Sequence, residues 1–428
     1  MTNQALCAII FASNFKRKAE KMKNETSKIS LRWIYIALCT VCLAFAGIIY
    51  AWSILKVPLA AEFGWSNTEL ALNFTLTMCT FCIGGFLGSR ISKLIGANLS
   101  LIAAGILAGG GFVIASFMKG DIITLYISYA VLAGLGIGVA YNVIIASVNA
   151  WFPDRRGFCS GCLLMGFGMT SLVFGSLLDA LFANEAFGWR KTFLFFGIIM
   201  AAMICTAGIV IRKPAADVVF PESKKKAAKK KESFEVRDMS PIQMLSRPSF
   251  WISFVYMTCL VAVGNSVISF AKDLALSTGA NAALATTLVG VLSFCNGLGR
   301  ILTGALFDAA GRRFTMIAAN ILSIVAAGTT LISVVIDSLP LCIVGLCLVG
   351  LAYGACPTVG SAFASSFYGQ KYFATNYSIV NFNLFAASFI ATACASLRTS
   401  SGGFVAPFVL LLSLACGALV LNICVRKP

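Results

Sequence analysis

Long apolar segments follow one another along most of the chain, and only short polar stretches separate them. A helix needs roughly 20 apolar residues to cross a bilayer core about 30 Å thick. The pattern therefore predicts an all-α membrane protein with twelve spans, at residues 33–55, 69–89, 99–118, 122–149, 158–182, 191–211, 249–271, 282–306, 314–336, 340–366, 373–396 and 404–425. An even number of spans places both ends of the chain on the same side of the membrane.

A polar segment in the middle of the chain divides these spans into two sets of six. It contains the run Lys-Lys-Lys-Ala-Ala-Lys-Lys-Lys at 224–231, which is typical of a solvated linker and can also attract anionic lipid. We expect an N-terminal extension at 1–31, a six-helix bundle at 32–212, the basic linker at 213–247 and a second six-helix bundle at 248–428. Transporters often consist of such repeats, with the substrate site between them near the bilayer midplane.

Composition and charge exclude other classes of protein. The chain is 59% hydrophobic and only 11% charged, whereas soluble domains have about a quarter charged residues. The net charge of +17 would suit a nucleic acid, but most of the 33 basic residues fall on one side of the predicted spans. The opposite side keeps Lys56, Lys119, Arg190, Lys191, Lys272 and Arg398. The positive-inside rule then predicts a multi-pass protein of the cytoplasmic (inner) membrane, with both termini cytoplasmic and no nucleic-acid partner.

The N-terminal extension at 1–31 has two possible interpretations, and neither is a cleaved signal. The first predicted span is too long and too deep in the chain for a cleaved secretory signal. The extension before it holds a weakly apolar stretch, Ala5–Phe15, which fits an interfacial helix. Met22 would instead open a short basic lead into the first span, so it is an equally good start of the protein.

Sixteen cysteines raise the question of a metal or redox site, because three pairs have two-residue spacing. These are Cys39/Cys42, Cys79/Cys82 and Cys159/Cys162. Each pair lies in an apolar span, and the chain contains no histidine and no polar second shell for a metal. Cysteine packs well between helices, so we expect no metal and no cofactor.

One ionisable residue, Arg300, lies well inside a predicted span, where a charge is costly and is a functional hypothesis by default. The alternative is an arginine that extends its charge to the membrane surface, but its neighbours Asn296, Gly297, Gly299 and Thr303 favour a polar cavity wall. Guanidinium binds a carboxylate with two donors and stays charged. We therefore expect a small anionic substrate. An empty carrier would hold a poorly compensated cation, which favours exchange over net flux.

The other polar residues within spans are tyrosines, a tryptophan and amides. They are Tyr50 and Trp52, Tyr141 and Asn142, Asn265, Tyr353, Asn381 and Asn383. A buried tyrosine needs a partner for its hydroxyl, so each is either an interhelical hydrogen bond or a substrate contact. Of these, we expect Tyr50, Trp52, Tyr141, Tyr353 and Asn383, together with Asn296, to join Arg300 in binding substrate.

The loop after the eighth span reads Gly304-Ala-Leu-Phe-Asp308-Ala-Ala-Gly311-Arg312-Arg313, and a degraded copy, with Lys93 in place of the aspartate, follows the second span. The intact loop resembles the signature of the major facilitator superfamily, which lies between the second and third helices of each six-helix half. The resemblance implies that fold. Gly311 permits a tight turn, and Asp308, Arg312 and Arg313 are candidates for a conformational latch.

A narrower resemblance covers about residue 32 to the C-terminus. It rests on Gly47-Ile-Ile-Tyr50-Ala-Trp52-Ser53, Glu62-Phe-Gly-Trp65-Ser66, Trp151-Phe-Pro-Asp154-Arg155-Arg156-Gly157 and Asn296-Gly-Leu-Gly-Arg300. These motifs are similar to those of the oxalate:formate antiporter family, which is related to the monocarboxylate transporters. The resemblance implies that Arg300 binds a carboxylate and that Tyr50, Tyr141 and Tyr353 line the cavity.

Three departures from these families change the expected cargo. The eleventh span has no lysine where the oxalate carrier has one, and Val349 stands where that carrier has a tryptophan. One buried cation undercompensates a dianion such as oxalate. Proton-coupled monocarboxylate transporters carry an aspartate four residues before the arginine, and this chain has Asn296 there, which cannot titrate. Lys56 is a possible second cation, but we expect it to be a solvated residue at the end of its span.

Together these features predict a monomeric secondary transporter, and not an enzyme, that moves a small monocarboxylate such as formate, lactate or pyruvate by exchange or facilitated diffusion. The open alternatives are oxalate:formate antiport, proton-coupled monocarboxylate symport, and transport of another anion such as a sulfonate or of a neutral or larger solute. A membrane sensor is disfavoured because the central loop is too short for an output domain. An enzyme is disfavoured because no span carries a carboxylate pair, histidine or motif-borne nucleophile.

Overall fold

The computed structural model describes residues 31–152, 156–212, 214, 238–369 and 371–425, and within these residues all regular structure is helical. It contains 12 helices long and apolar enough to cross a membrane. They are Leu31–Phe63, Asn67–Leu94, Gly96–Ser116, Ile122–Asn149, Cys159–Ala183, Gly188–Val210, Pro248–Ser277, Ala282–Phe307, Ala309–Val335, Leu339–Tyr368, Thr375–Ser401 and Val405–Cys424. The expected number of spans is confirmed.

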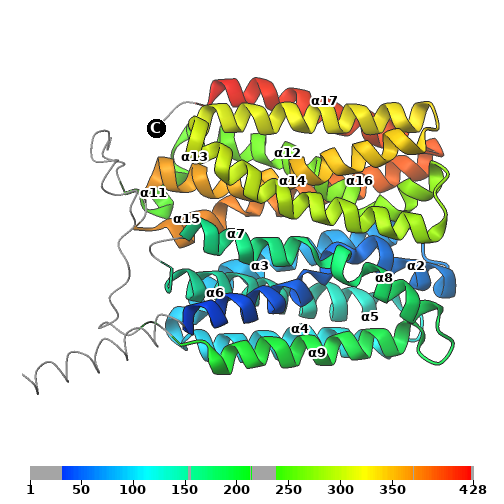
Figure 1. The fold of residues 1–428 in the computed structure, drawn as a ribbon, viewed down its shortest axis with the longest axis horizontal. Coiled ribbons are helices and arrows are strands. Elements are labelled where there is room, and N and C mark those ends of the chain that lie inside the picture. The colour runs from blue at the N-terminus through cyan, green and yellow to red at the C-terminus, as the bar shows by residue number, and fades with distance from the viewer. Residues whose placement is uncertain (1–30, 153–155, 213, 215–237, 370, 426–428) are drawn as a thin grey trace, which may run out of the picture.

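The helices form two bundles that lie against each other (Figure 1). The first half, residues 31–212, contains η1 (Gly47–Ala51), α2 (Trp52–Phe63), α3 (Asn67–Leu94), α4 (Ala97–Ser116), α5 (Ile122–Leu125), η2 (Tyr126–Ala133), α6 (Gly134–Asn149), α7 (Arg156–Gly168), α8 (Thr170–Ala183) and α9 (Gly188–Val210). The second half, residues 238–425, contains α11 (Pro241–Leu245), α12 (Pro248–Ser277), α13 (Ala282–Val335), α14 (Leu339–Tyr368), α15 (Phe373–Val380), α16 (Phe382–Ser401) and α17 (Val405–Cys424).

Most contacts stay within a half, such as α4 with α9 and α13 with α14. The two halves meet where α3 packs on α16, and where α7 and α8 pack on α13. The two-bundle architecture is therefore as expected. The N-terminal extension up to residue 30 and residues 215–237 of the linker lie outside the described part, so the boundaries of the four predicted segments stay a prediction.

The first helix is longer than predicted, because it continues past Lys56 to Phe63. The sequence pattern ended the span at residue 55, where a charge follows. Lys56 is buried and paired with Asp273 of the second half, so its charge does not have to reach water. Pro58 also lies inside this helix without ending it.

Several spans are interrupted rather than continuous. The first contains the 3-10 segment η1, and the fifth is broken at Met169 between α7 and α8. The eleventh is broken at Asn381 between α15 and α16, and α12 has a non-helical residue at Phe270. In transporters, interrupted helices commonly shape the substrate site. Here the breaks at η1 and Met169 lie beside residues that surround Arg300.

Candidate substrate site around Arg300

Arg300 lies on α13 at the contact between the two halves. Its side chain is only 4% exposed, and its Nη1 donates a hydrogen bond of 2.6 Å to the Leu164 carbonyl oxygen on α7 of the first half. Its Nε is buried and has no hydrogen-bond partner among the described residues. A carbonyl dipole thus compensates the guanidinium only in part, and no described carboxylate forms a salt bridge with it.

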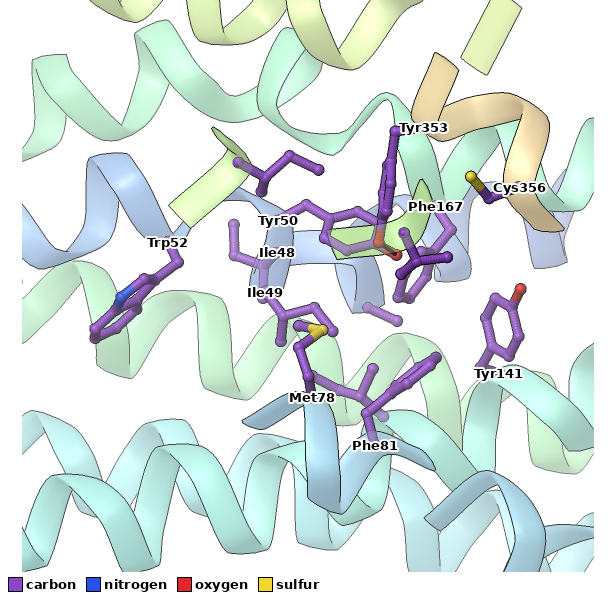
Figure 2. Close-up of a cluster of buried hydrophobic side chains, with 14 of the residues drawn as sticks. Ile48, Ile49, Tyr50, Trp52, Met78, Phe81, Tyr141, Phe167, Tyr353 and Cys356 are labelled. Carbon is purple, nitrogen blue, oxygen red and sulfur yellow. Dashed lines mark hydrogen bonds between the residues drawn. The ribbon is translucent and has the colours of Figure 1, made fainter. Parts of the chain in front are cut away.

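Two tyrosines from opposite halves meet next to this charge. The hydroxyls of Tyr50 on η1 and Tyr353 on α14 lie 3.1 Å apart, and their rings pack edge to face with centroids 5.9 Å apart. Figure 2 shows the two side chains pointing toward one another. The charge of Arg300 interacts with both hydroxyls, so the tyrosine pair and the arginine form one polar cluster inside the protein.

An aromatic wall from the first half completes one side of the cluster. Phe167 contacts Tyr50 with ring centroids 5.2 Å apart and Tyr141 with centroids 5.0 Å apart. Phe81 packs on both Phe167 and Tyr141. Arg300 also interacts electrostatically with the Tyr141 hydroxyl. These rings offer an apolar surface that suits the hydrocarbon part of a small organic acid.

Glycines bring the cation close to the backbone of neighbouring helices. A Cβ at Gly168, the last residue of α7, would lie 3.5 Å from Cζ and Nη2 of Arg300 and 3.4 Å from Nδ2 of Asn296. On the other side, a Cβ at Gly354 of α14 would collide with the Asn296 carbonyl oxygen. Glycine at these positions lets the helices approach closely and leaves the Arg300 and Asn296 heads facing the same small space.

Asn296 lies one helical turn before Arg300 on α13, and its side chain is buried. Its Oδ1 has no hydrogen-bond partner among the described residues. A buried acceptor without a partner is unusual in a folded protein and calls for an explanation. The cluster therefore contains one donor, Arg300 Nε, and one acceptor, Asn296 Oδ1, for which the described residues provide no hydrogen-bond partner.

The structure brings together five of the predicted binding residues: Arg300, Asn296, Tyr50, Tyr141 and Tyr353. Trp52 lies apart from them, as Figure 2 shows, because its indole donates to the Leu70 carbonyl oxygen at 2.9 Å and packs on Tyr129. Asn383 is buried near the start of α16, and none of the described contacts joins it to the cluster. Substrate binding by these residues stays a prediction.

Tyr377 on α15 belongs to the cluster but was missed from the sequence. Its hydroxyl donates to the Pro357 carbonyl oxygen at 3.4 Å, and Arg300 interacts with that hydroxyl electrostatically. The signal was a tyrosine inside the eleventh span, four residues before the break at Asn381.

The signature loop contains the predicted turn. Gly311 separates two helical segments within α13 and has φ 77°, in the left-handed region that favours glycine. The Arg312 guanidinium lies 4.2 Å from the centre of the Phe367 ring, and Arg313 is exposed. The side chain of Asp308 lies outside the described part of the chain. A latch formed by Asp308, Arg312 and Arg313 stays a prediction.

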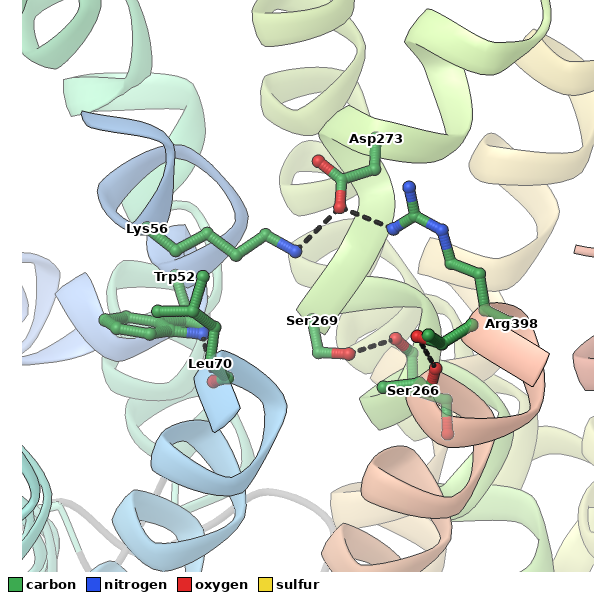
Figure 3. A network of polar contacts seen from close by, with 9 residues as sticks. Trp52, Lys56, Leu70, Ser266, Ser269, Asp273 and Arg398 are labelled. Atoms are coloured by element: carbon green, nitrogen blue, oxygen red, sulfur yellow. Dashed lines mark hydrogen bonds and ion pairs between the residues drawn. The ribbon is translucent and has the colours of Figure 1, made fainter. Parts of the chain in front are cut away.

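A second polar network joins the halves at the end of the molecule opposite α11. The Asp273 Oδ2 atom accepts from Lys56 Nζ at 2.8 Å and from Arg398 Nη1 at 2.7 Å (Figure 3). Lys272 Nζ lies 2.7 Å from Asp179 Oδ1, and Thr286 donates to the same carboxylate. The expectation that Lys56 is solvated was wrong, since it is 6% exposed and paired. Sequence spacing gave no sign of a partner 217 residues away.

Within the described residues, no group of three or more histidine, cysteine or acidic side chains is arranged to hold a metal ion.

The sequence matches the Major Facilitator Superfamily over residues 36–392 and again over 257–427. The chain belongs to the major facilitator superfamily. It is therefore a multi-pass membrane transporter and not an enzyme.

Similar proteins of this superfamily include carboxylate carriers. The oxalate:formate antiporter of Oxalobacter formigenes is 29% identical over 300 residues, which cover 68% of this chain and 67% of that protein. Human monocarboxylate transporter 12 is 25% identical over 301 residues, which cover 64% of this chain and 57% of that protein. The resemblance to these two groups is confirmed, at modest identity.

Solved structures of the superfamily have the same fold. The xylose transporter XylE from E. coli, in a partially occluded inward open conformation, superposes with a TM-score of 0.67 over 92% of this chain and 97% of that one. Sequence identity is 14%, so this likeness concerns the fold alone and carries no information on the substrate.

Proposed function

We propose that this major facilitator transporter moves a small organic monocarboxylate by alternating access, and that Arg300 binds the carboxylate. The observation that carries the proposal is a buried guanidinium, without a carboxylate partner among the described residues, at the contact between the two halves. An arginine keeps its charge even in a low-dielectric site. A bound anion would supply the compensation that the protein does not.

The free edge of the guanidinium defines how a carboxylate would sit. Nη1 is occupied by the Leu164 carbonyl, whereas Nε has no described partner and Nη2 faces the space beside Gly168. Nε and Nη2 form one side of the planar fork, which matches the two oxygens of a carboxylate. The hydroxyls of Tyr50 and Tyr353 then lie beside the anion, and the rings of Tyr141 and Phe167 cover its apolar part.

The charge of the cluster favours a monoanion. Two positive charges would be needed to compensate a dianion equally well, and Lys56, the other candidate cation, is engaged with Asp273. Asn296 cannot carry a proton in place of an aspartate. Exchange or facilitated diffusion is therefore preferred to proton symport. Of these two, exchange is favoured, because crossing with an empty and poorly compensated Arg300 would be costly.

One relative supports a second candidate. The antiporter of Oxalobacter formigenes is named for oxalate and formate, so oxalate:formate exchange is the alternative function. The two candidates differ in whether a dianion competes. We further propose that the protein is a monomer and that it lies in the cytoplasmic (inner) membrane with both termini in the cytoplasm. The distribution of basic residues supports the second part, the membrane and the orientation.

Uptake into proteoliposomes tests the proposal. The full chain is reconstituted, and uptake of a labelled monocarboxylate is measured against unlabelled formate, lactate, pyruvate, oxalate and a sulfonate analogue. We expect the monocarboxylates to compete and oxalate to compete weakly. Strong competition by oxalate would favour the alternative, and an absence of competition by every anion would refute the anion site.

A further inference from the structure

Two residues of the basic linker, Asp238 and Met239, bind the loop between α14 and α15, and we call them the strap. The Met239 N–H donates to the Tyr368 carbonyl oxygen at 3.0 Å, and the Met239 carbonyl oxygen accepts from Asn376 Nδ2 at 3.0 Å. Asp238 Oδ1 accepts from the Lys371 N–H at 3.1 Å. The strap therefore holds the end of α14 and the beginning of α15 together.

The loop is shaped to receive the strap. Gly369 has φ 76°, in the left-handed region that favours glycine, and a Cβ at this position would collide with Asp238 Oδ1. Met239 and Asn376 are buried. Figure 1 shows α11, which follows the strap, beside α15, and the two helices are in contact. The strap is therefore a built part of the second half and not a chance surface contact.

The helix α15 carries Tyr377, whose hydroxyl interacts electrostatically with Arg300. This hydroxyl donates to the Pro357 carbonyl oxygen at 3.4 Å, which is longer than the usual O–H···O distance of about 2.5–3.0 Å. Tyr377 is also partly exposed, whereas Tyr50 and Tyr353 are buried. Its hydroxyl is thus held loosely and can turn from the carbonyl to an anion bound at Arg300.

The direction of α15 depends on what surrounds it, because the helix has only eight residues and ends at the break at Asn381. A helix this short is not stable by itself. We propose, building on the proposed function, that the strap is a positioning element of the substrate site. By fixing α15 it places the Tyr377 hydroxyl so that it donates to the carboxylate at Arg300. Two residues outside the membrane-spanning helices then set the affinity for substrate.

Two substitutions on α15 separate the donor from the strap. Tyr377→Phe removes the donor itself, and we expect the KM for a monocarboxylate to rise by about tenfold. Asn376→Leu removes the bond to the strap but leaves the tyrosine, and KM should rise by about fivefold. In both variants kcat should stay unchanged, because only binding shared by the ground and transition states is lost. Since the strap acts through Tyr377, the double variant should have the KM of Tyr377→Phe alone.

Transport into proteoliposomes tests this inference. KM and kcat are measured for the full chain and each variant, with whichever of labelled formate, lactate and pyruvate the wild type transports best. Asn320→Leu is the matched control. Like Asn376, Asn320 is fully buried, donates through Nδ2 to a backbone carbonyl oxygen of another segment, and has an Oδ1 atom without a described partner. This control should lose stability as Asn376→Leu does but keep the wild-type KM.

A second variant of the strap guards against a folding defect. The Asp238 side chain is exposed, so we expect Asp238→Ala to fold. It should raise KM by about threefold when introduced into the wild type, and it should have no effect when introduced into Tyr377→Phe.

A wild-type KM in folded Asn376→Leu and Asp238→Ala would overturn the inference. So would a double variant whose KM rises by the product of the two single effects, because the strap would then act independently of Tyr377. A rise in KM of the same size in Asn320→Leu would also contradict it, as a sign of a general loss of packing. These outcomes leave the proposed function intact, which fails instead if the wild type transports none of the three anions.

Discussion

Two substitutions of Arg300 separate the effect of its charge on anion binding from the effect of its pair of hydrogen-bond donors. In Arg300→Lys the cation stays, but a carboxylate loses one of the two hydrogen bonds that the Nε and Nη2 edge offers. A hydrogen bond to a charged group contributes roughly 1.5–3 kcal/mol. Binding of a monocarboxylate should therefore weaken by about 10- to 150-fold in Arg300→Lys. Arg300→Gln removes the charge as well, and we expect no measurable anion binding.

The assay is the shift in melting temperature of purified protein with increasing monocarboxylate, which yields the dissociation constant without requiring transport. Lys119→Gln is the control, because this exposed residue also removes one positive charge and should bind like the wild type. Folding of each Arg300 variant is checked by its melting temperature without ligand. Wild-type affinity in a folded Arg300→Gln would refute the assignment of the carboxylate to Arg300.

Three further predictions follow from the same contacts. Gly168→Val should raise the KM for a monocarboxylate by about tenfold, since its side chain would fill the space beside Arg300 and Asn296. The control is Gly161→Val, whose added side chain meets nothing within 4 Å and should leave KM unchanged. An equal rise in KM in both variants would contradict the placement of the substrate beside Gly168. Gly311→Ala should lower stability by about 1 kcal/mol because φ is 77° there, whereas Gly328→Ala in open helical surroundings should not lower the melting temperature. Net efflux of a labelled monocarboxylate from proteoliposomes should be slower than exchange. Equal rates would contradict the claim that the poorly compensated charge of Arg300 slows the change of state in the empty carrier.

The fold could be predicted from local pattern because a membrane imposes it. Each span needs its own run of apolar residues, so the twelve helices are visible one by one in the sequence. The ends of spans were less certain where a charge has a distant partner. Lys56 illustrates this, because its partner Asp273 belongs to the other half and the pattern near Lys56 contains no trace of it.

The candidate site was predictable only in part, for a related reason. Arg300 stands out because a charge inside a span is costly, and the turn at Gly311 follows from its loop. Which aromatic residues lie beside Arg300 depends on how helices rotate and where they break. Tyr50 and Tyr353 meet across the halves, whereas Trp52, only two residues from Tyr50, faces Leu70 and Tyr129. Tyr377 was missed because its position depends on the break at Asn381.

A structure of the purified protein determined with a bound monocarboxylate tests the central claim most directly. We predict both carboxylate oxygens within hydrogen-bond distance of Arg300 Nε and Nη2, with Nη1 still donating to the Leu164 carbonyl oxygen. An anion bound elsewhere, with the Arg300 edge left empty, would contradict the account.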